Sequence, residues 1–171
     1  MSGRPLWTLG LFVAVLLIQR GAELALSARN SGRLRARGAR EFGARHYSLL
    51  VAVHALFPVA LVAEVIGLGA RPSGLWPLWL ALWLGAQGLR YWAVRTLGDR
   101  WSTRIWVLPG EALVRSGPYR FLRHPNYVAV VVELMCAALL FGAWRTALGI
   151  SALNFWALAV RIRAEERALG E

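Results

Sequence analysis

Residues 47–68 read YSLLVAVHALFPVALVAEVIGL, an apolar stretch that is interrupted by only two strongly polar side chains, His54 and Glu64. A helix needs about 20 predominantly apolar residues to cross the hydrocarbon core of a bilayer, so this stretch predicts a transmembrane helix. Four further stretches have a similar composition. We predict helices there as well, at 5–26, 75–97, 126–142 and from 144 onward.

The overall composition indicates a membrane protein. A mean hydropathy of +0.47 and a hydrophobic content of 57% are too high for a soluble domain of 171 residues. The net charge is +11, yet every basic residue is an arginine that lies between apolar stretches rather than along one polar face. This pattern excludes nucleic acid as an expected partner. Cys136 is the only cysteine, so we expect neither a disulfide framework nor a metal site.

The connections between the predicted helices fall into two kinds. The connections at 69–74 and 142–144 are short turns that contain glycine, so they predict that the second and third helices, and the fourth and fifth, are antiparallel neighbours. The connections at 28–46 and 98–124 are longer and rich in arginine.

The arginines predict the orientation in the membrane. If both long connections and the C-terminus face the cytoplasm, only Arg4, Arg71 and Arg145 of the 20 basic residues fall on the other side. The sequence therefore predicts an all-α, polytopic membrane protein of about five transmembrane helices, with its N-terminus outside and its C-terminus cytoplasmic. We expect it in the inner or plasma membrane, and we treat 1–171 as one membrane domain.

The connection at 98–124 is long for a compact bundle and is expected to be ordered. Bulky apolar residues alternate over 104–108, Pro109 and Gly110 suit the centre of a type II turn, and Leu113 and Val114 follow. We predict a short β-hairpin, or a similar cap, on the membrane surface before the fourth helix.

Ionisable side chains inside apolar stretches are costly and are functional candidates by default. The candidates here are Glu23, His54, Glu64, Arg90 and Glu133. The alternative is structural. Arg20 and Glu23, three residues apart, would form a local pair, Arg90 would extend to the interface, and His54 would be a packed, hydrogen-bonded residue.

Residues 113–127, LVRSGPYRFLRHPNY, form the densest group of polar and aromatic residues. Pro125 suits the first position of a helix, so His124 and the free N–H groups of the first turn would point out of the membrane at the positive end of the helix dipole. Such an end can hold a carboxylate or phosphate, although a plain helix cap would look similar. Arg161 and Glu165 are four residues apart and share a helix face, a spacing that on its own indicates a solvated pair.

With these motifs, residues 98–169 resemble the isoprenylcysteine carboxyl methyltransferase family of membrane enzymes. The residues that carry the resemblance are Leu113, Val114, Gly117–Tyr119, Arg123–Tyr127, Arg161, Glu165, Glu166 and Leu169. Ala129 departs from the pattern, because the family usually has glycine there, and so does the end at Glu171, which lacks a tail that many relatives carry.

The resemblance implies an S-adenosylmethionine-dependent methyltransferase whose lipid-like substrate enters from the bilayer, while the cofactor enters from the cytoplasm. Arg161 would face the substrate and position it. The residues implied to bind the cofactor are Leu113, Val114, Tyr119, His124, Pro125, Asn126, Tyr127 and Glu165. No obligate protein partner is expected.

The methyl acceptor stays open at this point. It would be an acidic oxygen, either a carboxylate, as in isoprenylcysteine, or the enol or phenol of a long-chain molecule such as an alkylated pyrone or a quinone precursor. The run 123–127 also resembles NADPH-dependent sterol reductases and phospholipid N-methyltransferases. A non-enzymatic role, as a scaffold or transporter, is the remaining alternative, but it would give the polar segment 115–127 no function.

Overall fold

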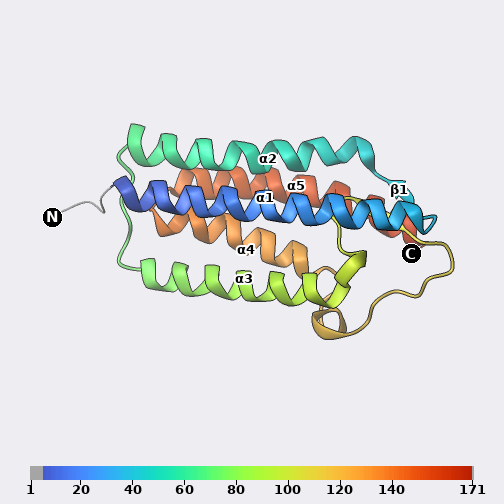
Figure 1. The fold of residues 1–171 in the computed structure, drawn as a ribbon. Helices are drawn as coiled ribbons and strands as arrows, with labels where there is room; N and C mark the ends of the chain where they lie inside the picture. Colours follow the sequence, from blue (N-terminus) through green and yellow to red (C-terminus); the bar gives the residue numbers. More distant parts are fainter. Residues whose placement is uncertain (1–5, 171) are drawn as a thin grey trace.

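The computed structural model describes residues 6–170 and is built almost entirely of helices (Figure 1). In chain order its elements are α1 (Leu6–Ala36), β1 (Arg40–Phe42), α2 (Ala44–Val62), the π-helix η1 (Ala63–Gly67), α3 (Trp76–Leu97), the 3-10 helix η2 (Gly98–Arg100), β2 (Ile105–Val107), the 3-10 helix η3 (Gly117–Arg120), α4 (Pro125–Leu140) and α5 (Trp144–Leu169). A mostly helical fold with helices in the five predicted regions is thus confirmed. Arg4, Pro5 and Glu171 lie outside the described residues.

Three helical segments are long and apolar enough to cross a membrane, as judged by length and composition: Leu6–Ala36, His46–Gly67 and Trp144–Leu169. The helix α4 is apolar but shorter. The helix α3 is long enough, but it is not apolar enough to count among these segments. Large apolar side chains such as Ile18, Val59 and Phe155 are exposed on the outer surfaces of the helices, as expected for contact with lipid. The chain is thus built as a membrane protein, while membrane crossing by α3 and α4, and the orientation, stay predictions.

The first helix is longer than predicted. We expected it to end at residue 26, but α1 continues to Ala36, so the first part of the predicted connection at 28–46 is helical. The fully buried Asn30 explains the extension, because its Nδ2 donates hydrogen bonds to the backbone carbonyls of Gly98 (3.2 Å) and Trp101 (2.9 Å). The polar last turns of α1 are therefore held by the connection that follows α3.

The predicted β-hairpin within 98–124 is wrong in its pairing. Strand β2 does lie where the alternating residues indicated, but it pairs antiparallel with β1 from the other long connection, with Glu41 opposite Trp106. Leu113 and Val114 form no strand and lie in an irregular loop. The two long connections thus form one ordered cap, at the same end of the bundle as the end of α5 (Figure 1).

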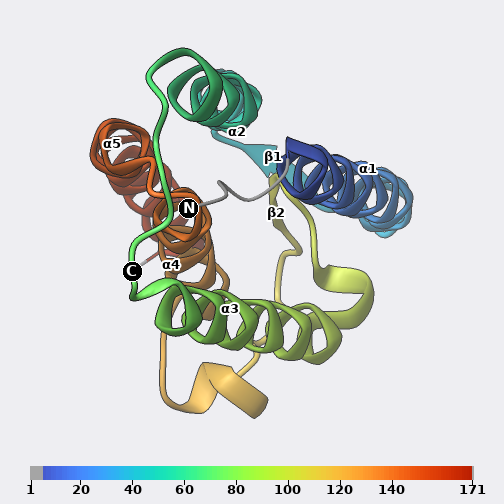
Figure 2. The same cartoon turned by 90° about the vertical axis from the view of Figure 1, so that its left-hand side faces the viewer.

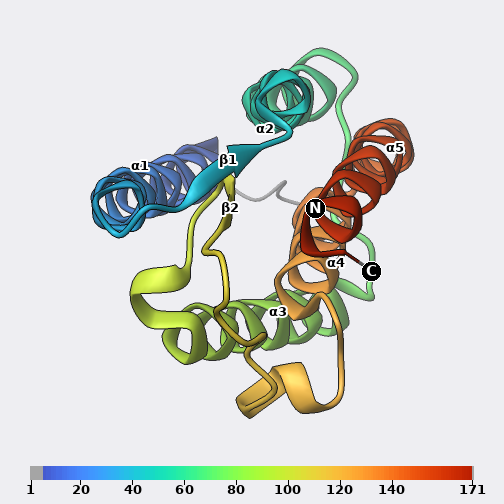
Figure 3. The same cartoon turned by 90° about the vertical axis from the view of Figure 1, so that its right-hand side faces the viewer.

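The opposite end of the bundle carries the compact core. Buried side chains of α1, α2, α4 and α5 pack there, and the Phe12 ring contacts both Trp83 and Phe141. Viewed along the helices, α4 lies between α3 and α5, whereas α1 stands on the other side of the bundle beside β1 and α2 (Figures 2 and 3).

Glu64 fixes the start of α5. Its buried carboxylate accepts hydrogen bonds from the backbone N–H groups of Arg145 (3.1 Å) and Thr146 (2.6 Å), which otherwise have no partner in the first turn of a helix. The turn beside it is tight, since a Cβ on Gly142 would overlap the backbone carbonyl of Arg71. Glu64, one of the functional candidates from the sequence, thus has a structural role at the start of α5.

Candidate functional site

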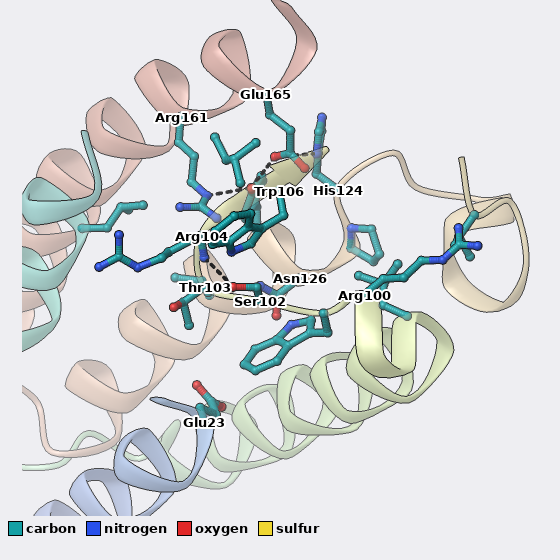
Figure 4. A pocket seen from close by; sticks show the side chains of 18 of the residues that line it. Glu23, Arg100, Ser102, Thr103, Arg104, Trp106, His124, Asn126, Arg161 and Glu165 are labelled. Atoms are coloured by element: carbon teal, nitrogen blue, oxygen red, sulfur yellow. Dashed lines mark hydrogen bonds and ion pairs between the residues drawn. The ribbon is translucent and has the colours of Figure 1, made fainter. Parts of the chain in front are cut away.

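A cavity of about 880 Å³ lies in the half of the bundle that is nearer the cap. Side chains from all five long helices line it, together with the connection between α3 and α4. Figure 4 shows Arg161 and Glu165 on α5 along one side and Glu23 on α1 at the other. All nine residues singled out from the sequence line this single cavity, namely Leu113, Val114, Tyr119, His124, Pro125, Asn126, Tyr127, Arg161 and Glu165.

Tyr127 joins the two polar residues of α5. Its hydroxyl donates a hydrogen bond to Oε2 of Glu165, and it accepts one from Nε of Arg161 at 2.8 Å. Arg161 is only 7% exposed, and its guanidinium lies over the Tyr127 ring, 5.6 Å from the ring centre. The reading of Arg161 and Glu165 as a solvated surface pair is therefore wrong, because a phenol bridges them in the cavity wall.

His124 occupies the position before α4, as predicted, with Pro125 as the first helical residue. That it points out of the membrane stays a prediction. Its ring stacks on the Tyr127 ring at 5.2 Å, with Nδ1 4.0 Å from Oε2 of Glu165. The backbone N–H groups of Tyr127 and Val128 both donate to the His124 carbonyl, so they are not free for an anion. Neither of these two positions therefore offers a free N–H group to a ligand.

The segment from 113 to 121 is held against α3 by a glycine. Gly117 has a φ of +56°, and a Cβ there would overlap the Thr96 hydroxyl and lie 3.1 Å from the Trp92 indole nitrogen. This close approach places Tyr119 in the cavity wall. Burial raises the pKa of the Tyr119 phenol above its ordinary value, and the negative charge of Glu165 acts in the same direction. Tyr119 therefore stays a neutral hydrogen-bonding group.

Asn126 completes the group of predicted residues. Its Oδ1 is buried and has no hydrogen-bond partner among residues 6–170. A buried amide oxygen without a partner costs free energy, so it marks a place where a ligand with an N–H or O–H donor fits. No group of three His, Cys, Asp or Glu side chains within the described residues is placed to hold a metal ion.

Comparison with known proteins decides the family. Residues 79–171, more than half of the chain, match the isoprenylcysteine carboxyl methyltransferase (ICMT) family. The chain belongs to this family. It is 42% identical over 161 residues to the uncharacterized protein YpbQ of Bacillus subtilis, an alignment that covers 94% of this chain and 96% of YpbQ. An uncharacterized protein of Haemophilus influenzae is 31% identical over 157 residues, which cover 91% of each chain. No solved structure matches significantly.

Membership of the isoprenylcysteine carboxyl methyltransferase family points to a membrane methyltransferase. The family match begins within α3, so the helices α1 and α2 lie before it, whereas the alignment with YpbQ covers nearly the whole chain. Both α1 and α2 contribute residues to the cavity. The cavity is therefore lined partly by α1 and α2, for which the family motifs predicted no role.

A second set of polar side chains lies at the deep end of the cavity. We call it the inner polar cluster, and it consists of Arg20, Glu23, His54, Arg90 and Glu133. Arg20 pairs with Glu23 and with Glu133, both at 2.6 Å, and Arg90 also pairs with both carboxylates. The expected local pair of Arg20 and Glu23 is thus confirmed. The expectation that Arg90 extends to the interface is wrong, because its side chain is only 3% exposed.

Several residues that line the cavity were not predicted from the sequence as site residues. Ser102, Thr103, Arg104 and Trp106 come from the segment around β2 and face the cavity together with Tyr47 of α2. The Arg104 guanidinium lies over the Tyr47 ring at 4.5 Å, and the Tyr47 hydroxyl lies 3.1 Å from that of Thr103. The alternation around residue 105 indicated a strand, but only the pairing with β1 brings these side chains to the cavity.

Proposed function

We propose that this protein is an S-adenosylmethionine-dependent O-methyltransferase that acts in the membrane on an acidic oxygen of a lipid-like substrate. The observation that carries the proposal is that all nine residues with an implied role line one cavity. Chance proximity does not account for this, because these residues come from a loop, the start of α4 and the end of α5, which are separated in the sequence. A cavity of about 880 Å³ is at the large end of the range for small-molecule sites, so it has room for a cofactor and a substrate headgroup.

The residues of the cavity fit the cofactor in their chemistry. The buried oxygen of Asn126 accepts a hydrogen bond from a donor such as an amino group, and the Glu165 carboxylate complements a positively charged or hydroxyl-bearing group. His124, Tyr119 and Tyr127 offer aromatic surface, while Leu113 and Val114 add apolar contact. When bound, S-adenosylmethionine supplies an electrophilic methyl group on a sulfonium.

The protein's part in the reaction is to bind, align and exclude water. A carboxylate with an ordinary pKa near 4 is already ionised at neutral pH, so such an acceptor requires no general base. Arg161 is held by Tyr127 with its guanidinium in the cavity wall, from where it can donate a charge-assisted hydrogen bond to the acceptor oxygen. Alignment of two bound reactants can supply several kcal/mol, up to about 7–11 in well-oriented systems.

We also propose that the cavity faces the cytoplasm from the inner or plasma membrane. Both long connections and the end of α5 lie at the cavity end of the bundle (Figure 1). That end therefore holds most of the 20 arginines, as the positive-inside rule requires for a cytoplasmic face. The lipid-like substrate would enter from the bilayer, and no nucleic acid or obligate protein partner is proposed.

Calorimetric titration of the detergent-purified protein tests the function. We expect saturable binding of S-adenosylhomocysteine, no binding of NADPH, and loss of binding in the His124→Ala and Glu165→Ala variants. His46→Ala is the matched control, because His46 is exposed on α2 and does not line the cavity. Binding of NADPH alone would instead assign the protein to the reductases and remove the role given to Arg161.

A further inference from the structure

The inner polar cluster lies deeper in the bundle than the residues assigned to the cofactor. Tyr127 and Glu133 are both on α4, six residues apart, which corresponds to about 9 Å along the helix at 1.5 Å per residue. On α2, Tyr47 and His54 both line the cavity and are seven residues apart, or about 10 Å by the same rise. The cavity therefore runs from a polar outer region to a polar inner one.

Apolar side chains separate these two regions. Val130 lies one turn below Tyr127 on α4, and Leu158 lies one turn below Arg161 on α5. Leu50 and Val51 of α2 line the same level. A group that reaches the inner polar cluster therefore passes an apolar section, which a lipid-like molecule does readily.

The charges of the inner polar cluster are balanced within it. Both Glu133 oxygens are engaged by Arg20 and Arg90. Both Glu23 oxygens are engaged as well, one of them also by Gln19 at 3.2 Å. Two arginines and two glutamates cancel, so the cluster has no net charge with which to attract a second anion or cation. Its best complement is a neutral polar group, because a charged one would be transferred from water without compensation.

Two atoms of the cluster keep free hydrogen-bonding capacity. His54 donates from Nδ1 to the Leu50 carbonyl at 2.8 Å, which leaves Nε2 of the neutral imidazole as an acceptor in a residue that lines the cavity. Arg90 is buried, and its Nε–H has no acceptor within the part of the chain that the structure describes. The inner polar cluster thus has one free acceptor on α2 and one free donor on α3.

We propose that the inner polar cluster binds a neutral hydroxyl of the methyl acceptor other than the acidic oxygen that Arg161 positions, with His54 Nε2 accepting from that hydroxyl and Arg90 Nε–H donating to its oxygen. This inference rests on the proposed function and narrows it, since the acceptor then carries a neutral hydroxyl deep in the cavity in addition to the oxygen that is methylated. A carboxylate has no proton to donate to His54, and the cluster offers it no net positive charge.

The test measures binding of tritiated 3-pentadecylphenol to the immobilised, detergent-purified protein in a scintillation proximity assay, with unlabelled hexadecanoic acid as competitor. We expect saturable binding of the phenol and weak competition by the acid. His54→Phe removes the acceptor and keeps an aromatic ring, so it should weaken phenol binding about tenfold, the effect of losing one hydrogen bond. His54→Gln retains an acceptor and should stay within about threefold of the wild type.

The control variant is His46→Phe on the exposed face of the same helix, which should bind the phenol like the wild type. The inference is overturned if the wild type does not bind the phenol saturably, if His54→Phe binds it equally well, or if the acid competes as strongly as unlabelled phenol. S-adenosylhomocysteine binding is measured on the same samples. Its absence alongside phenol binding would remove the proposed function and leave the inner site standing.

Discussion

Replacing Tyr127 by phenylalanine removes one hydroxyl from the cavity wall and leaves the ring. That hydroxyl makes two hydrogen bonds to charged groups, one to the Glu165 carboxylate and one from the Arg161 guanidinium at 2.8 Å. Both α5 side chains then lose the group that sets their position. Because Arg161 is almost fully buried, water does not readily replace the missing acceptor.

The size of the effect follows from these two bonds. A hydrogen bond to a charged group contributes about 1.5–3 kcal/mol. Arg161 and Glu165 share a helix face and can pair directly once the phenol is gone, which recovers part of the loss. We therefore expect the variant to lose the equivalent of about one such bond, and S-adenosylhomocysteine affinity to fall about 10- to 150-fold at about 1.4 kcal/mol per factor of ten.

Isothermal titration calorimetry of the wild type and the Tyr127→Phe variant measures this loss. Tyr91→Phe is the matched control, because Tyr91 is 61% exposed on α3, and its affinity should equal that of the wild type. If Tyr127→Phe binds S-adenosylhomocysteine as tightly as the wild type does, the phenol bridge does not organise the cofactor site and this reasoning is refuted.

Glu133→Gln leaves two arginines to share the single carboxylate of Glu23, and the one uncompensated positive charge should cost about 3–5 kcal/mol and lower the Tm of thermal unfolding by about 6–20 °C; Asp99→Asn, at an exposed carboxylate, should leave Tm unchanged. Arg161→Ala should reduce methyl transfer far more than S-adenosylhomocysteine affinity, with little rescue by lysine, and an equal loss of both would contradict its role as a substrate-positioning residue. Gly117→Ala should lower Tm more than Gly110→Ala does, because both have positive φ but only Gly117 has no room for a Cβ.

Much of the outer site could be predicted from the sequence because its signals are local. Pro125 fixes the first residue of α4 and therefore the place of His124, whatever packs around it. The spacing of Arg161 and Glu165 puts both on one face of a helix. The apolar stretches predicted the helices for the same reason, since length and composition are properties of each segment alone.

The features that could not be predicted depend on segments that are distant in the sequence. Strand β2 pairs with β1, more than 60 residues earlier, and nothing in 104–108 distinguishes that partner from Leu113 and Val114. The paired state of Arg90 requires Glu133 from a different helix and Glu23 from a third. The direction of the His124 ring likewise depends on Glu165, which lies on α5.

Transfer of a tritiated methyl group from S-adenosylmethionine to a lipid extract, catalysed by the purified protein, tests the central claim most directly. The account predicts label in an organic-soluble product with the wild type and with Asp99→Asn, and background label with Glu165→Ala. Release of the label as methanol by mild alkali would identify a carboxyl ester, whereas alkali-stable label would identify an enol or phenol ether. No transfer by a wild-type protein that unfolds cooperatively, or undiminished transfer by Glu165→Ala, would contradict the account.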